Sequence, residues 1–279
     1  MSGYKEFRDI AARIARTAGD FAAAQRRKGV HAIGSKSSIV DVVTQVDRDA
    51  EAMIGDLLLR ARPDDGLLGE EGASKEGTSG VTWVVDPIDG TVNFLYGIPH
   101  YAVSIAAVEG EPEPGQWKIV AGAVYNPSLD ELFTAHLGGG AHLGSTPLQV
   151  ADPVALEEAL WLTGFAYSAS HRSVQAQLVL QMLPQVRDIR RMGTASLDLT
   201  AIAARRGNIY FERTLSPWDH AAGELIVTEA GGAVSGLAGR PAGREGLVAG
   251  HPQMVDIFAR AIESMGGDEE LYTSLPEQK

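Results

Sequence analysis

Apolar side chains recur at helical spacing along the first sixty residues. Near the amino end they fall three or four positions apart, at Phe7, Ile10, Ile14, Ala18 and Phe21. Because this is the period of one face of an α-helix, the pattern predicts a long amphipathic helix packed against the core. A second helix is expected from about Thr44, with an apolar face formed by Val46, Ala50, Met53 and Leu57.

The pattern changes between about residues 81 and 163. Short apolar and β-branched runs, broken by Gly, Pro and Asn, predict strands at TWVVD, YAVSIAAV, IVAGAVY and ALWLTG. Further along, helices are expected over 173–186, 195–205, 221–230 and 252–263, and strands over 209–212 and 246–249. This alternation predicts an α/β protein in which helix and sheet layers follow one another.

Glycine and proline signals divide the chain into two expected halves. The Gly-rich stretch 138–144 and the turn at Asp152 mark the seam between an amino-terminal half, 1–145, and a carboxyl-terminal half, 146–265. The first three glycines lack the Gly-Lys-Ser/Thr ending of a P-loop and predict a hairpin turn. The polar residues 266–279 show no periodicity and predict a disordered tail.

Composition and charge exclude several classes of function. With 279 residues, 44% of them hydrophobic, the chain can bury a large core, and its lack of cysteine excludes disulfides and thiolate chemistry. The 36 acidic against 24 basic side chains give a formal charge of −12, which repels nucleic-acid backbone. No run resembles a secretory signal or reaches the roughly 20 apolar residues of a membrane span. We therefore expect a cytoplasmic protein without nucleic-acid or membrane partners.

The segment from Trp83 to Phe94 carries the strongest chemical signal. An apolar strand ends there in two carboxylates three residues apart, Asp86 and Asp89, and Gly90-Thr91 then start a helix. Free N–H groups at a helix start form an anion site, so cations and a phosphate could meet at this strand end. The alternative is an acidic turn in which an aspartate only caps the helix.

Three further acidic clusters allow the same two interpretations. Glu70-Glu71 follow an apolar run, Asp41 and Asp47 flank a helix start, and Asp219 stands at the head of an Ala-rich helix. Each alone is consistent with a solvated pair or a helix cap. Together, carboxylate oxygens without cysteine or paired histidine ligands favour hard cations such as Mg²⁺, and two such ions can clamp a phosphoryl group.

Three motifs occur in a specific order and separation: Gly69-Glu70-Glu71, Asp86-Pro87-Ile88-Asp89-Gly90-Thr91 with Asn93-Phe94, and Trp218-Asp219 followed by Ala-Ala-Gly. In these motifs the chain resembles the inositol monophosphatase family, within the wider group of lithium-sensitive, magnesium-dependent phosphatases, from about residue 5 to 263. The resemblance implies a layered αβαβα sandwich, hydrolysis of a phosphomonoester with two or three Mg²⁺ ions, inhibition by Li⁺, and a homodimer.

The resemblance also implies a set of metal ligands. One Mg²⁺ would be held by Glu70, Asp86 and the carbonyl of Ile88. A second would be held by Asp86, Asp89 and Asp219, and a weaker third would lie near Glu70.

Catalytic and substrate roles follow from the same resemblance. Water would attack phosphorus in line, and the ions would lower its pKa. Glu70 and the Thr91 hydroxyl, oriented by Asp47, would position the water and take its proton. The backbone amides of Gly90 and Thr91 would bind the phosphate. The residues that would contact the substrate are Asp89, Gly193, Thr194, Ala195, Glu212 and Asp219.

The substrate stays open among several phosphates. Glu212 and the uninterrupted match from Asp86 to Phe94 favour myo-inositol monophosphate. Relatives that dephosphorylate fructose 1,6-bisphosphate, histidinol phosphate or adenosine bisphosphate need the same carboxylates, and Glu212 could instead be the charged end of a strand at 209–211. Arg190 and Arg191 could face an anionic substrate or a dimer partner. A partner-binding regulator on a phosphatase scaffold is the alternative from another class, and the intact ligand set argues against it.

Overall fold

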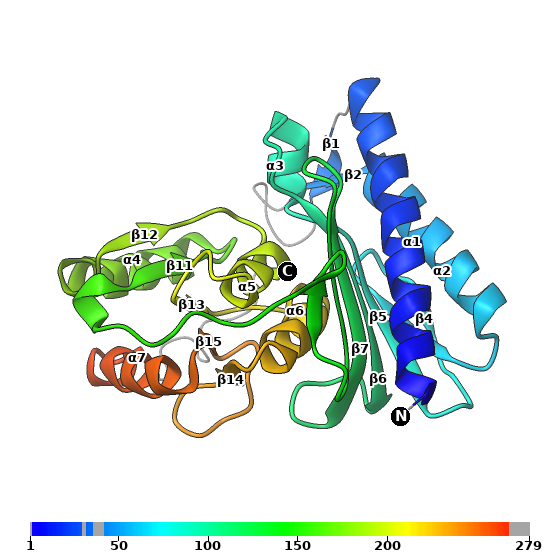
Figure 1. Cartoon of the computed structure of the whole chain (residues 1–279). Helices are drawn as coiled ribbons and strands as arrows, with labels where there is room; N and C mark the ends of the chain where they lie inside the picture. Colours follow the sequence, from blue (N-terminus) through cyan, green and yellow to red (C-terminus); the bar gives the residue numbers. More distant parts are fainter. Residues whose placement is uncertain (1, 30–31, 36–41, 268–279) are drawn as a thin grey trace.

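The described chain is built of five alternating layers. The computed structural model describes residues 2–29, 32–35 and 42–267. These residues form helix, sheet, helix, sheet and helix layers, which cross Figure 1 from right to left. The predicted αβαβα sandwich is confirmed.

Two helices cover the outer face of the first sheet. The predicted amphipathic helix is α1 (Ser2–Arg27), whose Ile14 and Ala18 are fully buried. The second, α2 (Gln45–Ala61), begins directly after Thr44, as predicted. Both lie at the right of Figure 1 and contact each other and the sheet.

The buried face of α2 differs from the predicted one. Ile54 and Leu58 are fully buried, whereas Leu57 is only half-buried. Two acidic side chains, Asp47 and Glu51, share the buried face at helical spacing with these two residues. Of the predicted face, Ala50 is fully buried and Val46, Met53 and Leu57 pack against the core, so a pattern of apolar residues alone finds part of the face and misses the acidic part, which it takes as exposed.

The first sheet is eight-stranded in the described part of the chain. Its strands are β3 (Gly66–Gly69), β4 (Ser74–Lys75), β5 (Val81–Asp89), β6 (Ala102–Gly110), β7 (Trp117–Asn126), β8 (Glu131–His136), β9 (Ala141–Leu143) and β10 (Thr146–Pro147). They lie in the order β10-β9-β8-β7-β6-β5-β3-β4. Neighbours are antiparallel except β3 and β5, which are parallel. Strands β1 (Ala32–Ser35) and β2 (Val42–Thr44) form a separate antiparallel pair.

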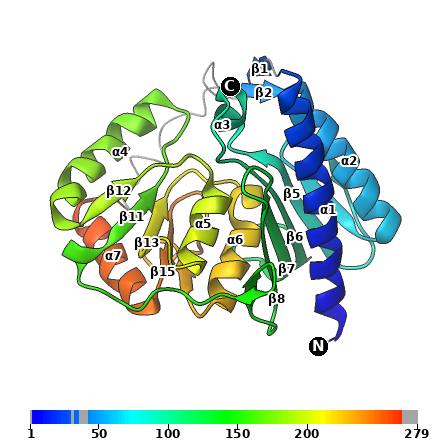
Figure 2. The ribbon, with the colours of Figure 1, turned by 45° about the horizontal axis from the view of Figure 1, so that its top comes forward.

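Helices α5 (Ala195–Ala203) and α6 (Pro217–Glu229) fill the layer between the sheets (Figure 2). Small residues let this layer pack closely. A Cβ at Gly122 of β7 would lie 3.0 Å from the backbone of α6, and a Cβ at Gly223 of α6 would lie 2.7 Å from Leu199 of α5. These glycines therefore set the distance between the middle helices and their neighbours.

The second sheet is five-stranded among the described residues, with the strand order β12-β11-β13-β15-β14. Its outer face is covered by α4 and α7, where Trp161, Phe211 and Phe258 meet in the core. The bounds are β11 (Leu160–Thr163), β12 (Asp188–Arg190), β13 (Ile209–Glu212), β14 (Ala233–Ser235), β15 (Leu247–Gly250), α4 (Ala169–Met182) and α7 (Pro252–Ser264).

Two predicted helices have different ends. The helix expected over 221–230 already begins at Pro217, because Ser216 is its N-cap residue and proline is favoured in a first helical turn. The helix expected over 173–186 runs over Ala169–Met182, and a short 3-10 turn containing a proline follows it.

The chain crosses between the sheets near Asp152. The first sheet reaches Pro147 and the second begins at Leu160, whereas the Gly-rich stretch 138–144 lies within the first sheet. Its first glycines form the predicted hairpin turn, between β8 and β9. The boundary at residue 145 and the homodimer stay predictions.

Residues 268–279 of the expected tail, and Asp41, lie outside the described residues. None of the helices that the structure describes has the length and apolar character needed to cross a membrane.

Candidate active site

Acidic residues follow two parallel strands that end side by side. Strand β3 pairs with β5 so that Gly69 lies opposite Val85. The backbone N–H of Glu70 bonds to the Val85 carbonyl at 3.2 Å, which places Glu70 beside Asp86. Two separate sequence motifs therefore meet at one edge of the first sheet.

Asp86 lies at the centre of the acidic group, which consists of Glu70, Asp86, Asp89 and Asp219. Its side chain is 1% exposed, and its carboxyl is in hydrogen-bond contact with that of Glu70. Burial, followed by the charges of Glu70, Asp89 and Asp219, raises the pKa of Asp86 well above its usual range. The four carboxylates predicted as metal ligands therefore lie close enough to repel one another.

Asp89, the last residue of β5, is held by the first turn of α5. The N–H of Ser196 donates to Asp89 Oδ2 at 2.7 Å, and the backbone of Ala195 contributes a further hydrogen bond. Burial raises the pKa of Asp89 to about 6, against these hydrogen bonds, which lower it. The start of α5 thus fixes a carboxylate of the first sheet.

Asp219 reaches the same group from α6. Its Oδ2 accepts the Ser216 N–H at 2.7 Å, and its own N–H bonds to the Ser216 carbonyl at 3.1 Å, so Asp219 also caps the helix. The side chain is half-buried, and burial, then the charges of Glu70 and Asp89, raise its pKa well above the usual range. Asp219 therefore does both: it caps α6 and it belongs to the acidic group.

Asp47 connects the start of α2 with the start of α3 (Thr91–Tyr96). The Thr91 hydroxyl lies 3.1 Å from Asp47 Oδ1 and 3.1 Å from the Ile88 carbonyl. The other oxygen, Oδ2, accepts the Thr44 N–H at 2.9 Å and closes the cap of α2. One buried carboxylate thus caps a helix and orients the Thr91 hydroxyl.

Asn93 joins the Gly90-Thr91 turn to the Gly193-Thr194 turn. Its side-chain amide donates to the carbonyls of His100 and Met192, each at 2.8 Å. Gly90 has a φ of 91°, and a Cβ there would lie 2.4 Å from the Thr194 hydroxyl, so only glycine fits. The turns predicted to bind phosphate and substrate therefore lie against each other.

Glu212, at the end of β13, is electrostatically coupled to Asp89. Its Oε2 accepts the Tyr210 hydroxyl at 2.8 Å. Burial raises the pKa of Glu212 to about 7, although the Tyr210 hydrogen bond and the charge of Arg191 oppose the shift. A Cβ on Gly164 would lie 2.0 Å from Glu212 Oε2, so the carboxylate packs directly on that turn.

The profile of the inositol monophosphatase family matches residues 4–265. The chain belongs to the inositol monophosphatase family. Inositol-1-monophosphatase SuhB of Mycobacterium tuberculosis is 44% identical over 252 residues, which cover 86% of this chain and 84% of that protein. Nus factor SuhB of Escherichia coli is 39% identical over 255 residues, or 88% and 92% of the two chains.

Solved structures of the inositol monophosphatase family have the same fold. The crystal structure of extragenic suppressor protein suhB from Bartonella henselae matches with a TM-score of 0.81 at 36% identity. The match covers 91% of this chain and 97% of that one. Family membership supports a phosphatase and leaves its substrate open.

The donor set of this inositol monophosphatase family member fits Mg²⁺. The candidate ligands are all oxygen donors, which Mg²⁺ prefers: Glu70, Asp86, Asp89, Asp219 and the Ile88 carbonyl. The Glu70–Asp86 contact and the raised pKa of Asp86 show an excess of negative charge that a divalent cation would neutralise. In the described residues no three His, Asp or Glu side chains are already arranged to hold an ion.

Two residues that support the site, Ser196 and Asp198, lie outside the sequence motifs, and Asn93 lies within one without a predicted role. Asp198 is 1% exposed on α5, and neither carboxylate oxygen has a hydrogen-bond partner within the described chain. Burial, then the charges of Glu212 and Asp89, raise its pKa well above the usual range. An aspartate between two leucines of an apolar helix is the signal that could have identified it.

A surface cavity of about 610 Å³ lies away from the acidic group, between the end of α1 and α3. It is lined by residues that include Arg26, Arg27, Tyr96 and Tyr101, and by none of the predicted site residues. The acidic group is the candidate active site, because it brings together the motifs predicted to bind metal and phosphate.

Proposed function

We propose that this protein hydrolyses a small phosphomonoester with Mg²⁺, and specifically myo-inositol monophosphate to inositol and phosphate. The observation that carries the proposal is the convergence of Glu70, Asp86, Asp89 and Asp219 on one edge of the first sheet. Membership of the inositol monophosphatase family over residues 4–265 supports the phosphatase activity.

Two Mg²⁺ sites share Asp86 in this proposal. One Mg²⁺ would be held by Glu70, Asp86 and the Ile88 carbonyl, the other by Asp86, Asp89 and Asp219, and a weaker third would bind near Glu70. When bound, such ions lower the pKa of water and neutralise the phosphoryl oxygens.

The remaining steps belong to residues of the chain itself. Asp47 accepts a hydrogen bond from Thr91 and so holds the hydroxyl in one orientation. Glu70 and the Thr91 hydroxyl position the attacking water, and its proton passes to the Glu70 carboxylate, or to Thr91 as the hydroxyl proton of Thr91 moves to Asp47. The backbone N–H groups of Gly90 and Thr91 donate to the phosphoryl oxygens, where negative charge develops.

Substrate hydroxyls are recognised by Glu212 and by the turn Gly193-Thr194-Ala195, with Asp89 and Asp219 beside the reacting end. The contact between this turn and Gly90 supports the proposal, because it brings hydroxyl and phosphate recognition within one small substrate's length. Glu212 offers a carboxylate, which accepts hydrogen bonds from a polyol more strongly than a neutral group does.

Phosphate release from a substrate panel tests the proposal. Turnover should be fastest on myo-inositol monophosphate, ahead of fructose 1,6-bisphosphate, histidinol phosphate and adenosine bisphosphate. EDTA should abolish it, Mg²⁺ should restore it, and Li⁺ should inhibit it at subsaturating Mg²⁺. Undiminished turnover in excess EDTA would overturn the metal-dependent mechanism, whereas a different fastest substrate would overturn only the choice of inositol phosphate.

One observation favours a second role, as a partner-binding regulator. The Escherichia coli relative, 39% identical, is named a Nus factor. The variant Asp89→Asn separates the two roles in a strain that lacks the protein. If Asp89→Asn restores the phenotype of that strain as fully as the native chain does, the biological role depends on partner binding. If the variant accumulates normally but does not restore the phenotype, the biological role depends on catalysis.

A further inference from the structure

A second acidic side chain of α2, Glu51, lies behind the turn that carries Glu70. Its side chain is 4% exposed. Glu51 Oε2 accepts the backbone N–H of Glu71 at 2.7 Å, and Oε1 accepts the N–H of Ala73 at 2.8 Å. Both carboxylate oxygens therefore bind the backbone of one short turn.

That turn is the tip of the hairpin between β3 and β4. The Gly69 N–H closes it by bonding to the Ala73 carbonyl at 2.7 Å. A Cβ on Gly69 would lie 2.3 Å from Glu51 Oε2, so the carboxylate occupies space that any other residue at 69 would fill. The hairpin tip is thus fitted around the Glu51 carboxylate.

Glu70 lies between the residues that Glu51 contacts. Its flanking residues Gly69 and Glu71 touch the Glu51 carboxylate, and its own N–H is bonded to the Val85 carbonyl. With the backbone held from both sides, the Glu70 carboxyl is directed at Asp86.

We propose that Glu51 is a positioning residue, which holds the turn from Gly69 to Ala73 so that the Glu70 carboxylate meets a divalent cation together with Asp86. The proposal rests on the proposed function, in which Glu70 is a Mg²⁺ ligand. Residues that hold metal ligands in place typically contribute about 10- to 100-fold to metal affinity or activity.

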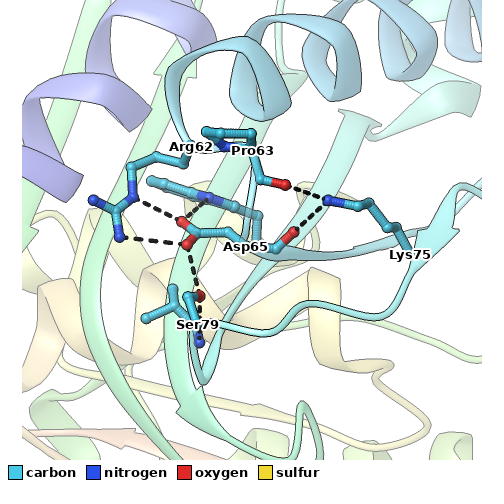
Figure 3. A network of polar contacts seen from close by, with 7 residues as sticks. Arg62, Pro63, Asp65, Lys75 and Ser79 are labelled. Carbon is cyan, nitrogen blue, oxygen red and sulfur yellow. Dashed lines mark hydrogen bonds and ion pairs between the residues drawn. The ribbon is translucent and has the colours of Figure 1, made fainter.

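The same strand offers a matched control at its other end. Asp65, just before β3, is 1% exposed and accepts hydrogen bonds from Arg62 and Ser79 (Figure 3). It also accepts one from the Trp83 side chain at 3.0 Å. Like Glu51, Asp65 is a buried carboxylate that holds this hairpin, but it lies at the ends and not at the tip, and the hydrogen bonds in which it takes part involve no residue of the acidic group. Its loss should affect folding without affecting the ions.

Glu51→Gln keeps the size of the side chain but turns one acceptor into an N–H₂ group that faces a backbone N–H. Mn²⁺, which accepts the same oxygen ligands, reports metal affinity by electron paramagnetic resonance without any turnover. We expect Glu51→Gln to weaken Mn²⁺ binding about 10- to 100-fold and to lower kcat, with little change in KM. Asp65→Asn should lower the unfolding temperature and leave Mn²⁺ affinity and kcat unchanged.

A double-mutant cycle tests whether Glu51 acts on Glu70 through its contact with Gly69. Gly69→Ala pushes on the Glu51 carboxylate from the other side, so it should reproduce the loss, and the two changes together should be less than additive. If Glu51→Gln fails to fold, Glu51→Asp keeps the charge but is one methylene too short to reach both amides, and the same weakening is expected.

Two results distinguish failure of this inference from failure of the proposed function. If Glu70→Gln weakens Mn²⁺ binding and neither Glu51 variant does, Glu51 is a structural residue and the inference is overturned. If Glu70→Gln itself leaves Mn²⁺ binding unchanged, Glu70 is no ligand and the proposed metal site falls with it.

Discussion

The backbone N–H of Ser196 donates a hydrogen bond of 2.7 Å to Asp89 Oδ2. Asp89 ends a strand of the first sheet, whereas Ser196 lies in the first turn of a helix between the sheets. The bond spans 107 positions of sequence. The candidate site is therefore complete only when both parts of the chain have folded together.

Asp89 and Asp219 should act as one unit, because both are proposed to hold the same ion. Asp89→Asn and Asp219→Asn should each lower kcat by about 10³-fold or more, and the double variant should be little worse than either single variant. Steady-state phosphate release measures the losses. Asp152→Asn, in an exposed ion pair with Arg205, is the control and should be fully active. Losses that multiply in the double variant would assign the two aspartates to separate tasks.

The Thr91 hydroxyl should matter for chemistry more than for binding. Thr91→Val keeps the shape of the side chain but removes the hydroxyl that bonds to Asp47, so kcat should fall by about 10²- to 10⁴-fold with KM nearly unchanged. Thr91→Ser keeps the hydroxyl and should keep most of the activity. A Thr91→Val enzyme with native kcat would show that the hydroxyl does not position water.

Glu212 should separate recognition from chemistry. Glu212→Gln weakens hydrogen bonds to substrate hydroxyls, so kcat/KM for myo-inositol monophosphate should fall roughly ten- to a hundredfold. An aryl phosphate, which has no such hydroxyls, should change by no more than about threefold. An equal loss on both substrates would make Glu212 structural or catalytic. No loss on either would remove the best support for a polyol substrate.

Carboxylates with raised pKa values should make the metal-free protein less stable at higher pH. Burial raises the pKa of Asp89 to about 6 and that of Glu212 to about 7. Between the usual carboxyl range near pH 4 and about pH 7, the folded state thus binds more protons than the unfolded chain. The free energy of unfolding therefore falls as pH rises through this window.

The double variant Asp89→Asn with Glu212→Gln isolates this effect. The half-buried histidines His100, His136 and His171 have lowered pKa values and act in the opposite direction, but equally in both proteins. Without metal, the variant should gain stability relative to the native chain from pH 5 to pH 8, on the order of 2 kcal/mol. Urea unfolding at a series of pH values measures the difference. A constant difference would show that these carboxylates are not destabilised by burial.

The local elements of the fold were predictable from sequence. Helix periodicity marks α1, and apolar runs between turn residues mark β5, β6 and β7, because such patterns reflect which side chains face a core. The buried face of α2 was not predictable in the same way. Asp47 and Glu51 occupy it because they bind the Thr91 hydroxyl and the Glu71 amide, which lie far along the chain.

Part of the candidate site was likewise predictable from sequence, and part was decided only by the tertiary structure. The order of the motifs around Glu70, Asp86 and Asp219 identified the family and its acidic residues, because metal and phosphate chemistry restricts the residue types in those short segments. The contacts of Asn93 and Glu51 are different. They join segments distant in the chain, so only the packing of the layers decided which backbone groups these side chains would meet.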